Sequence, residues 1–130
     1  MLAKDHDVAI AEEHCAPGQP LQCAGLVTAR GVPAIARRSI VGEVKGVRIH
    51  SPLGHVLELK ARSSRAYVLD RPKFDDLLFQ DAVDSGAVPL LGSSVRQVRT
   101  ERRSVRSEIV RQGHTDLLSS SLVVGADGYR

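Results

Sequence analysis

The feature that most constrains the fold is a short apolar run near the start of the chain that ends in carboxylates. Residues 8–11 are all apolar, and Glu12 and Glu13 follow them directly. A run of this length without polar alternation is typical of a strand buried on both faces, as in a parallel sheet. Residues 2–4 read as the last turn of a helix leading into this strand. The sequence therefore predicts an α/β fold that begins in mid-motif.

One helix is well marked between residues 70 and 86. Asp70 is a good N-cap, Pro72 stands in the first turn, and Gly86 is a natural stop. Between them, apolar residues recur at helical spacing: Phe74, Leu77, Leu78 and Ala82.

Short strands are predicted on both sides of this helix. Residues 26–38 have weak helical spacing, broken by Gly31 and Pro33. The predicted strands before the helix are 44–50, 56–59 and 66–69, the first two forming a hairpin. After the helix we expect a strand at 88–91 and an antiparallel meander from 95–100, 105–111 and 117–124.

Composition excludes several classes of protein. The chain has 130 residues, of which 42% are hydrophobic and 25% charged, as in ordinary globular proteins. No apolar stretch approaches the ~20 residues of a membrane span, and no secretory signal is visible. A cytoplasmic location is therefore expected, and two cysteines are too few for a disulfide scaffold. Cys15 and Cys23 with His14 match no common zinc spacing, so no metal site is predicted.

Basic residues are concentrated in the predicted meander and leave one alternative open. The formal net charge is +3, and the local excess comes from Arg96, Arg99, Arg102, Arg103, Arg106 and Arg111. Clustered arginine can neutralise phosphate, so a non-catalytic basic binding module is one interpretation. A solvated hairpin face with interleaved Glu101 and Glu108 is the interpretation we favour, and no nucleic-acid partner is expected.

Two segments indicate where a ligand would bind. A buried strand that ends in a carboxylate, here Glu12, can present it to the diol of an adenosine ribose. Near the other end, an apolar strand at 122–124 runs into Gly125, Ala126, Asp127 and Gly128. The glycines let the backbone pass close to another group, and Asp127 could hold a ligand hydroxyl. Each signal alone is weak, since surface acids and tight turns are common.

Together, three segments resemble a known family. The segment from Glu12 to Gly25 resembles the "E…G-x-P…C-x-G" loop of geranylgeranyl reductases. The segment from Tyr67 to Asp75 resembles their "Y-x-x-x-R-x-x-F-D" strand and helix. Residues 122–128 are similar to the "VGADG" segment of many flavoprotein monooxygenases and reductases. The resemblance spans nearly the whole chain. Geranylgeranyl reductases are FAD-dependent oxidoreductases of the p-hydroxybenzoate-hydroxylase-like superfamily.

The resemblance implies a fold and a set of site residues. The implied fold is a partial FAD-binding Rossmann-like domain, α/β with a mixed sheet and an antiparallel meander near the C-terminus. Glu12 would bind the adenosine ribose, Cys23, Ala24 and Gly25 would lie along the flavin, and Arg71 would reach the cofactor. Val95 would contact the adenine, and Asp127 would lie near the ribityl chain or pyrophosphate. Cys23 is also the one candidate catalytic residue, as a proton donor or a group that tunes the flavin.

The resemblance also implies an activity. The parent enzyme would use FAD to reduce carbon–carbon double bonds of isoprenoid chains in archaeal-type lipids or related prenyl compounds. NAD(P)H and ferredoxin are candidate electron donors, and peripheral membrane contact is an expectation for the full-length protein. An FAD-dependent aromatic hydroxylase or other monooxygenase is the alternative enzyme.

Three segments that are typical of the family do not occur in residues 1–130. The glycine-rich phosphate loop, the later "GD" segment and the C-terminal substrate domain are all missing from the sequence. We therefore expect a fragment of a FAD/NAD(P)-binding domain that is inactive alone. Without the phosphate loop, weak FAD binding or none is expected. The "C-x-G" loop is also shorter than the Cys-Gly-Glu-Gly form of many relatives. Ala24 and Gly25 therefore do not align residue by residue with that longer form.

Overall fold

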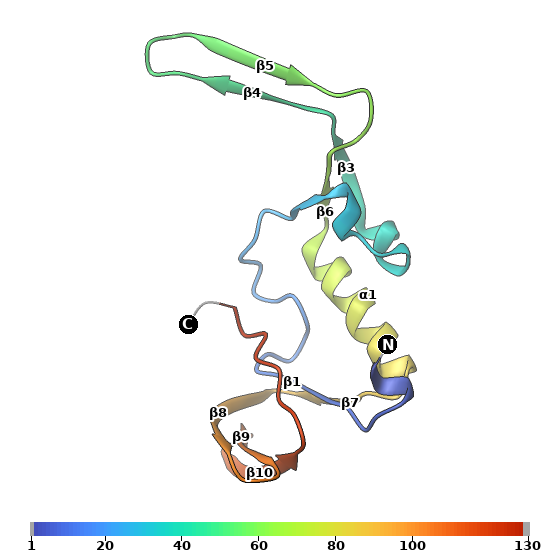
Figure 1. Cartoon of the computed structure of the whole chain (residues 1–130), viewed down its shortest axis with the longest axis vertical. Coiled ribbons are helices and arrows are strands. Elements are labelled where there is room, and N and C mark those ends of the chain that lie inside the picture. The colour runs from blue at the N-terminus through green and yellow to red at the C-terminus, as the bar shows by residue number, and fades with distance from the viewer. Residues whose placement is uncertain (1, 129–130) are drawn as a thin grey trace. The chain divides into compact units, whose positions relative to one another are not determined.

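The computed structural model describes residues 2–128, which divide into two compact units (Figure 1). Unit 1 comprises Pro17–Ser85, and unit 2 comprises Leu2–Ala16 together with residues 86–128. The fold is α/β with an antiparallel meander, as the sequence predicts. In place of one mixed sheet, the described residues form four small sheets, one parallel and three antiparallel. Within residues 2–128, no helix has the length and apolar content that crossing a membrane requires.

Unit 2 contains the predicted parallel strand pair. A 3₁₀ turn, η1 (Leu2–Lys4), precedes β1 (Ala9–Glu12), and β1 pairs in parallel with β7 (Val88–Leu91). Ala9 lies opposite Val88, and Glu12 lies opposite Leu91. The parallel pairing that the apolar run predicts is therefore confirmed, and it places the Glu12 carboxylate at the carboxyl end of β1. The predicted burial on both faces is wrong, since Ala9 and Ala11 are exposed and β1 pairs with one strand among the described residues.

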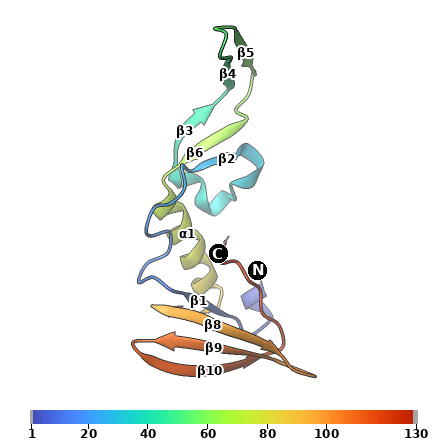
Figure 2. The same cartoon turned by 90° about the vertical axis from the view of Figure 1, so that its left-hand side faces the viewer.

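Unit 2 also contains the predicted meander. β8 (Ser93–Thr100), β9 (Val105–Arg111) and β10 (His114–Ser120) form an antiparallel sheet in the order β10–β9–β8, as Figure 2 shows. The turn between β9 and β10 places Gln112 and Gly113 at positive φ, which suits a two-residue hairpin turn. Ile109 is the buried apolar residue of the central strand.

The last strand lies closer to the N-terminus than the predicted range of 117–124, because it begins at His114. Its pairing ends at Ser120, and residues 121–128 have no regular structure. The prediction that 122–124 continues as a strand is therefore wrong in the structure. A strand needs a neighbour for its backbone hydrogen bonds, and none pairs with this segment among the described residues.

Unit 1 is built on a three-stranded antiparallel sheet. The central strand β6 (Ala66–Leu69) lies between β2 (Leu26–Thr28) and β3 (Ile40–Val44). Two 3₁₀ turns, η2 (Ala29–Gly31) and η3 (Ala34–Ser39), connect the outer strands. The helical tendency predicted for 26–38 is thus only partly correct. Its first residues pair with β6, and Pro33, which cannot donate a backbone hydrogen bond, precedes η3.

One α-helix follows β6 and packs against η3. α1 (Arg71–Asp84) begins at the predicted N-cap, where Asp70 Oδ1 accepts a hydrogen bond from the backbone N–H of Lys73 at 3.3 Å. Phe74 and Leu77 are buried on its inner face. We define the core set as Val32, Ala36, Leu69 and Phe74, each at most 9% exposed. This core set joins η3, β6 and α1.

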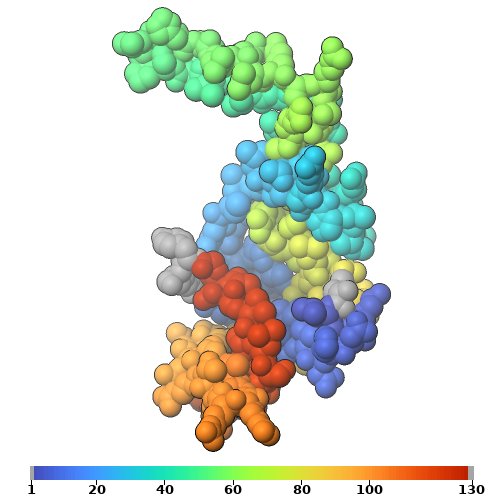
Figure 3. All heavy atoms as spheres, in the orientation of Figure 1, coloured from blue at the N-terminus to red at the C-terminus, as the bar shows by residue number. Residues whose placement is uncertain are grey.

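The hairpin β4 (Gly46–His50) and β5 (Val56–Lys60) extends away from this core, and no second layer covers it among the described residues of unit 1 (Figures 1 and 3). Val47 lies opposite Leu59 and Ile49 lies opposite Leu57, so these four side chains share one face. We define these four residues as the hairpin set. Each is 50% to 53% exposed. Arg48, paired at 2.9 Å with Glu58, lies on the opposite face.

Candidate functional site

The loop that enters unit 1 carries the predicted flavin-contacting residues. Cys23 and Ala24 are exposed, and Gly25 is buried at the point where the loop becomes β2. The loop contains a cis peptide bond between Gln19 and Pro20. The structure therefore leaves the Cys23–Ala24 backbone accessible from solvent within unit 1.

Gly25 is required where it stands because the loop passes directly against the end of β6. Its φ is +75°, a conformation that favours glycine. A Cβ at this position would collide with the carbonyl oxygen of Leu69 and would lie 3.3 Å from Cγ of Arg71. The Leu69 N–H donates to the Gly25 oxygen at 2.9 Å. The loop and the start of α1 are consequently held together.

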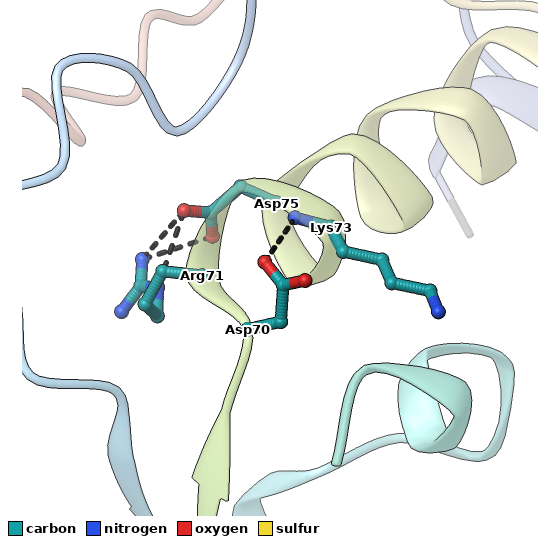
Figure 4. A network of polar contacts seen from close by, with 4 residues as sticks. All are labelled: Asp70, Arg71, Lys73 and Asp75. Carbon is teal, nitrogen blue, oxygen red and sulfur yellow. Dashed lines mark hydrogen bonds and ion pairs between the residues drawn. The ribbon is translucent and has the colours of Figure 1, made fainter. Parts of the chain in front are cut away.

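Arg71 is fixed at the start of α1 by its neighbours on the helix (Figure 4). Nη2 donates to both carboxylate oxygens of Asp75, at 2.8 and 2.9 Å, and Nε donates to Oδ2 at 3.2 Å. The guanidinium carbon also lies 5.7 Å from the centroid of the Phe74 ring, within the range of a cation–π contact. Because Phe74 belongs to the core set, the guanidinium is tied to the core of unit 1.

The pKa of Arg71 depends on Cys23 as well as on Asp75. Hydrogen bonding to Asp75 raises the pKa of the Arg71 guanidinium, partial burial opposes this, and the proximity of Asp75 and Cys23 adds to the rise. Cys23 therefore lies within electrostatic reach of Arg71. The structure brings together four predicted site residues in unit 1: Cys23, Ala24, Gly25 and Arg71.

The other predicted site residues belong to unit 2. Glu12 ends β1, and its Oε1 accepts hydrogen bonds from the backbone N–H and ring Nδ1 of His14, at 2.9 and 2.7 Å. Val95 lies on β8 just before an irregularity in the β8–β9 pairing and is 44% exposed. Asp127 is exposed in the irregular segment after β10. Unit 2 thus carries Glu12 and Val95 on regular strands and Asp127 outside them.

Two polar residues of these groups were not predicted as site residues. Asp75 was named only as the end of the segment that resembles the family motif, yet it holds Arg71. The four-residue spacing of Arg71 and Asp75 on one helix was a usable signal for an ion pair. His14 was considered only as a zinc ligand, and its contact with Glu12 has no comparable sequence signature.

The cysteines and the basic strands carry the remaining candidate chemistry. Among residues 2–128, no group of three or more His, Cys, Asp or Glu side chains could hold a metal ion. Cys15 and Cys23 are exposed free thiols. Arg99 lies directly opposite Arg106 in the meander, and Arg106 Nη2 is 3.2 Å from Glu101 Oε1. One acidic residue, Glu101, thus pairs with an arginine of the meander.

Comparison with curated proteins extends the resemblance seen in the sequence. No family model matches the chain. It is 30% identical over 127 residues to an uncharacterised protein of Methanocaldococcus jannaschii, across 96% of this chain and 32% of that protein. It is 32% identical over 132 residues to digeranylgeranylglycerophospholipid reductase 1 of Methanococcoides burtonii, with the same two coverages of 96% and 32%. The chain thus spans about a third of the length of the curated relatives it matches.

The fold is also similar to that of a solved reductase-like protein. A geranylgeranyl bacteriochlorophyll reductase-like protein from Thermoplasma acidophilum matches 87% of this chain and 31% of its own, with 25% identity and a TM-score of 0.71. The similarity to geranylgeranyl reductases that the sequence indicates is confirmed by this structure and by the named reductase relative.

Two further solved structures show the fold alone. An anhydrotetracycline hydroxylase from Streptomyces rimosus matches 97% of this chain and 28% of its own, with 18% identity and a TM-score of 0.73. A flavin-dependent halogenase matches 92% of this chain and 24% of its own, with 17% identity and a TM-score of 0.68. The fold of this chain therefore recurs in enzymes of different reactions.

Proposed function

We propose that this chain is part of an FAD-dependent oxidoreductase of the geranylgeranyl reductase type, which saturates isoprenoid double bonds in lipids or related prenyl compounds. The observation that carries the proposal is the fixed Arg71 guanidinium beside the Cys23 loop, in a segment that resembles the family's strand-and-helix motif. The named reductase relative, similar over 96% of the chain, supports the same activity.

The chemistry of the side chains present fits FAD. Arg71 is a rigid donor of several hydrogen bonds, which suits flavin or phosphate oxygens. Glu12 is an acceptor at the carboxyl end of a parallel strand, the place where such folds bind the ribose of a dinucleotide. Cys23 and Ala24 are exposed residues, so a ligand can reach them from solvent. The groups that would hold the cofactor are thus of the right kind.

In the proposed reaction, reduced FAD supplies the hydride, and the protein binds, orients and protonates. Arg71 would orient the cofactor from the start of α1, and Cys23 would tune the ring or donate a proton to the substrate carbon. Glu12 would fix the adenosine, Val95 would contact the adenine through its backbone, and Asp127 would lie near the ribityl chain or pyrophosphate.

The remaining parts of the proposal concern the whole protein. We propose that residues 1–130 are a partial FAD/NAD(P)-binding domain of a longer, cytoplasmic enzyme. NAD(P)H or ferredoxin would supply its electrons. Its substrate would be a prenyl lipid, and contact with the membrane surface would give access to that substrate.

The experiment is a titration of the ¹⁵N-labelled chain, followed by amide NMR signals, with three ligands up to millimolar concentration. FAD should shift amides around Cys23 and Arg71 and also those around Glu12 and Val95. FMN, which lacks the adenosine, should shift only the first group, and ADP only the second. Millimolar concentrations are used because binding by this chain is expected to be weak.

Variants sharpen the same measurement. Arg71→Ala should abolish the shifts caused by FMN, whereas Arg62→Ala, at an exposed arginine of the same unit, should leave them unchanged. If FMN shifts amides elsewhere in the chain but none around Cys23 and Arg71, or if Arg62→Ala weakens FMN as much as Arg71→Ala does, the proposed flavin site is wrong.

A further inference from the structure

His14 makes an unusual set of contacts at the carboxyl end of β1. Its ring Nδ1 lies 2.7 Å from Oε1 of Glu12, and its backbone N–H donates to the same oxygen at 2.9 Å. Its ring Nε2 lies 3.8 Å from Oε1 of Glu13. Its carbonyl oxygen accepts from the N–H of Gly92 at 3.0 Å, just before β8. His14 is therefore tied to β1 and to the segment after β7.

These contacts use one oxygen of Glu12 and spare the other. Both donors from His14 go to Oε1, and neither hydrogen bond involves Oε2. An ionised carboxylate only accepts hydrogen bonds, so Nδ1 of His14 must carry the proton in this contact. The Glu12 side chain is 31% exposed, so a ligand hydroxyl has access to it.

We propose that His14 is a positioning residue that holds Oε1 of Glu12 and leaves Oε2 to accept a ribose hydroxyl of an adenosine ligand. This inference rests on the proposed function, in which Glu12 binds the adenosine half of FAD. The advantage to the protein is preorganisation. A free glutamate loses rotamer freedom when a ligand fixes it, whereas a glutamate already fixed by His14 loses little.

The first experiment examines His14 without any ligand. The ¹⁵N signals of the imidazole distinguish the two neutral tautomers, and the proposal requires a proton on Nδ1 while Glu12 is ionised. In Glu12→Gln the preference for this tautomer should weaken, because the neutral amide is a poorer acceptor than the carboxylate. A neutral ring protonated at Nε2 in the wild-type chain would overturn the proposal.

The second experiment compares three variants of His14 in binding ADP, measured by NMR titration. His14→Ala should weaken ADP binding about three- to tenfold, the range expected for one orienting hydrogen bond. His14→Asn places an amide donor near the position of Nδ1 and should restore most of the affinity. His14→Gln places its donor near the position of Nε2 and should restore little.

A matched ligand separates positioning from a merely structural role. 2′,3′-Dideoxyadenosine diphosphate offers no ribose hydroxyl, so its affinity should be equal for the wild-type chain and for His14→Ala. An equal loss for ADP and for the dideoxy compound would mean that His14 only supports the fold, and the proposal would be wrong.

The outcomes for the inference and for the proposed function differ. If the wild-type chain binds ADP and FAD but His14→Ala binds both equally well, the inference fails and the proposed function stands. If ADP and FAD bind the wild-type chain but shift none of the amides around Glu12 and Val95, the proposed site is wrong and the inference falls with it.

Discussion

Unit 1 contains two sets of four apolar residues that differ in solvent exposure. The core set of Val32, Ala36, Leu69 and Phe74 is buried where η3, β6 and α1 meet. The hairpin set of Val47, Ile49, Leu57 and Leu59 lies on one face of a two-stranded sheet and remains about half exposed. Both sets are equally apolar, and both hairpin strands have complete backbone pairing.

The difference shows that pairing two strands does not by itself bury their apolar side chains. Pairing satisfies backbone hydrogen bonds along a hairpin, but burial of a sheet face requires a second layer. Residues of η3 and α1 supply that layer at the end of β6, where Ala36 and Phe74 pack with Leu69. Four perturbations, given from the largest expected effect to the smallest, test this comparison.

The largest effect is expected from removing a core aromatic ring. Phe74→Ala should lower the free energy of unfolding of unit 1 by about 3–5 kcal/mol, since it leaves a cavity and also removes the ring beside Arg71. Leu57→Ala in the hairpin set should cost less than about 1 kcal/mol, because half of the side chain is already in water. Urea denaturation of the two variants measures both values. Equal losses would show that the hairpin face is covered in solution.

The next effect concerns two glycines that share a positive φ and differ in their surroundings. Gly25 (φ +75°) stands against Leu69, whereas a Cβ added at Gly54 (φ +83°) in the hairpin turn would meet no other atom within 4 Å. Gly54→Ala should cost about 1–2 kcal/mol, the strain of the left-handed conformation alone. Gly25→Ala should cost about 1–3 kcal/mol more, because the backbone must also move apart. Similar losses in thermal unfolding would mean that the close approach to Leu69 does not exist.

A smaller effect is expected at the helix cap. Asp70→Ala should destabilise unit 1 by about 1 kcal/mol, because the Lys73 N–H loses its acceptor. Lys73→Ala is the matched control, since it keeps the backbone donor and should change stability by less than about 0.5 kcal/mol. Both variants are compared by urea denaturation. If the control costs as much as Asp70→Ala, the helix does not depend on this cap.

The smallest effect is a pH dependence at the base of the hairpin. The Ser64 hydroxyl, 2.6 Å from Glu43 Oε2, holds the pKa of Glu43 below its ordinary value of 4.5, with a lesser contribution from Lys45. A lowered folded-state pKa stabilises the protein above about pH 4.5, and this stabilisation is lost as the pH falls through the lowered pKa.

The measurement is the free energy of unfolding between pH 6 and pH 3. Wild-type protein should lose more stability on acidification than Ser64→Ala, in which Glu43 lacks its main stabilising donor. Glu43→Gln should show the weakest dependence, because no proton binds there. A Ser64→Ala profile parallel to that of the wild type would contradict the assigned cause.

Sequence reasoning predicted those elements whose signals are local. The helix predicted between Asp70 and Gly86 has a cap, a stop and an apolar face, and each of these signals depends on residues close together in the sequence. The meander follows from alternating runs and polar turns. The parallel pairing of β1 could be inferred because a double-sided apolar strand has few other environments.

What sequence reasoning missed depends on contacts between distant residues. Residues 26–28 have a helical spacing, but pairing with β6 overrides this weak preference. The clustering of Cys23, Gly25 and Arg71 was expected only through the family resemblance, since nothing local to each residue indicates the others. The His14–Glu12 contact depends on a rotamer, which no residue pattern specifies.

The division of unit 2 into two sequence segments has a consequence for the order of folding. β1 pairs with β7, so residue 9 meets residue 88, and all of unit 1 lies in the loop between them. Closing a long flexible loop costs conformational entropy, and that cost falls once the intervening residues are compact. We expect unit 1 to form first and the β1–β7 pair to close late, which pulse-labelled hydrogen exchange would record as delayed protection of the amides of β1.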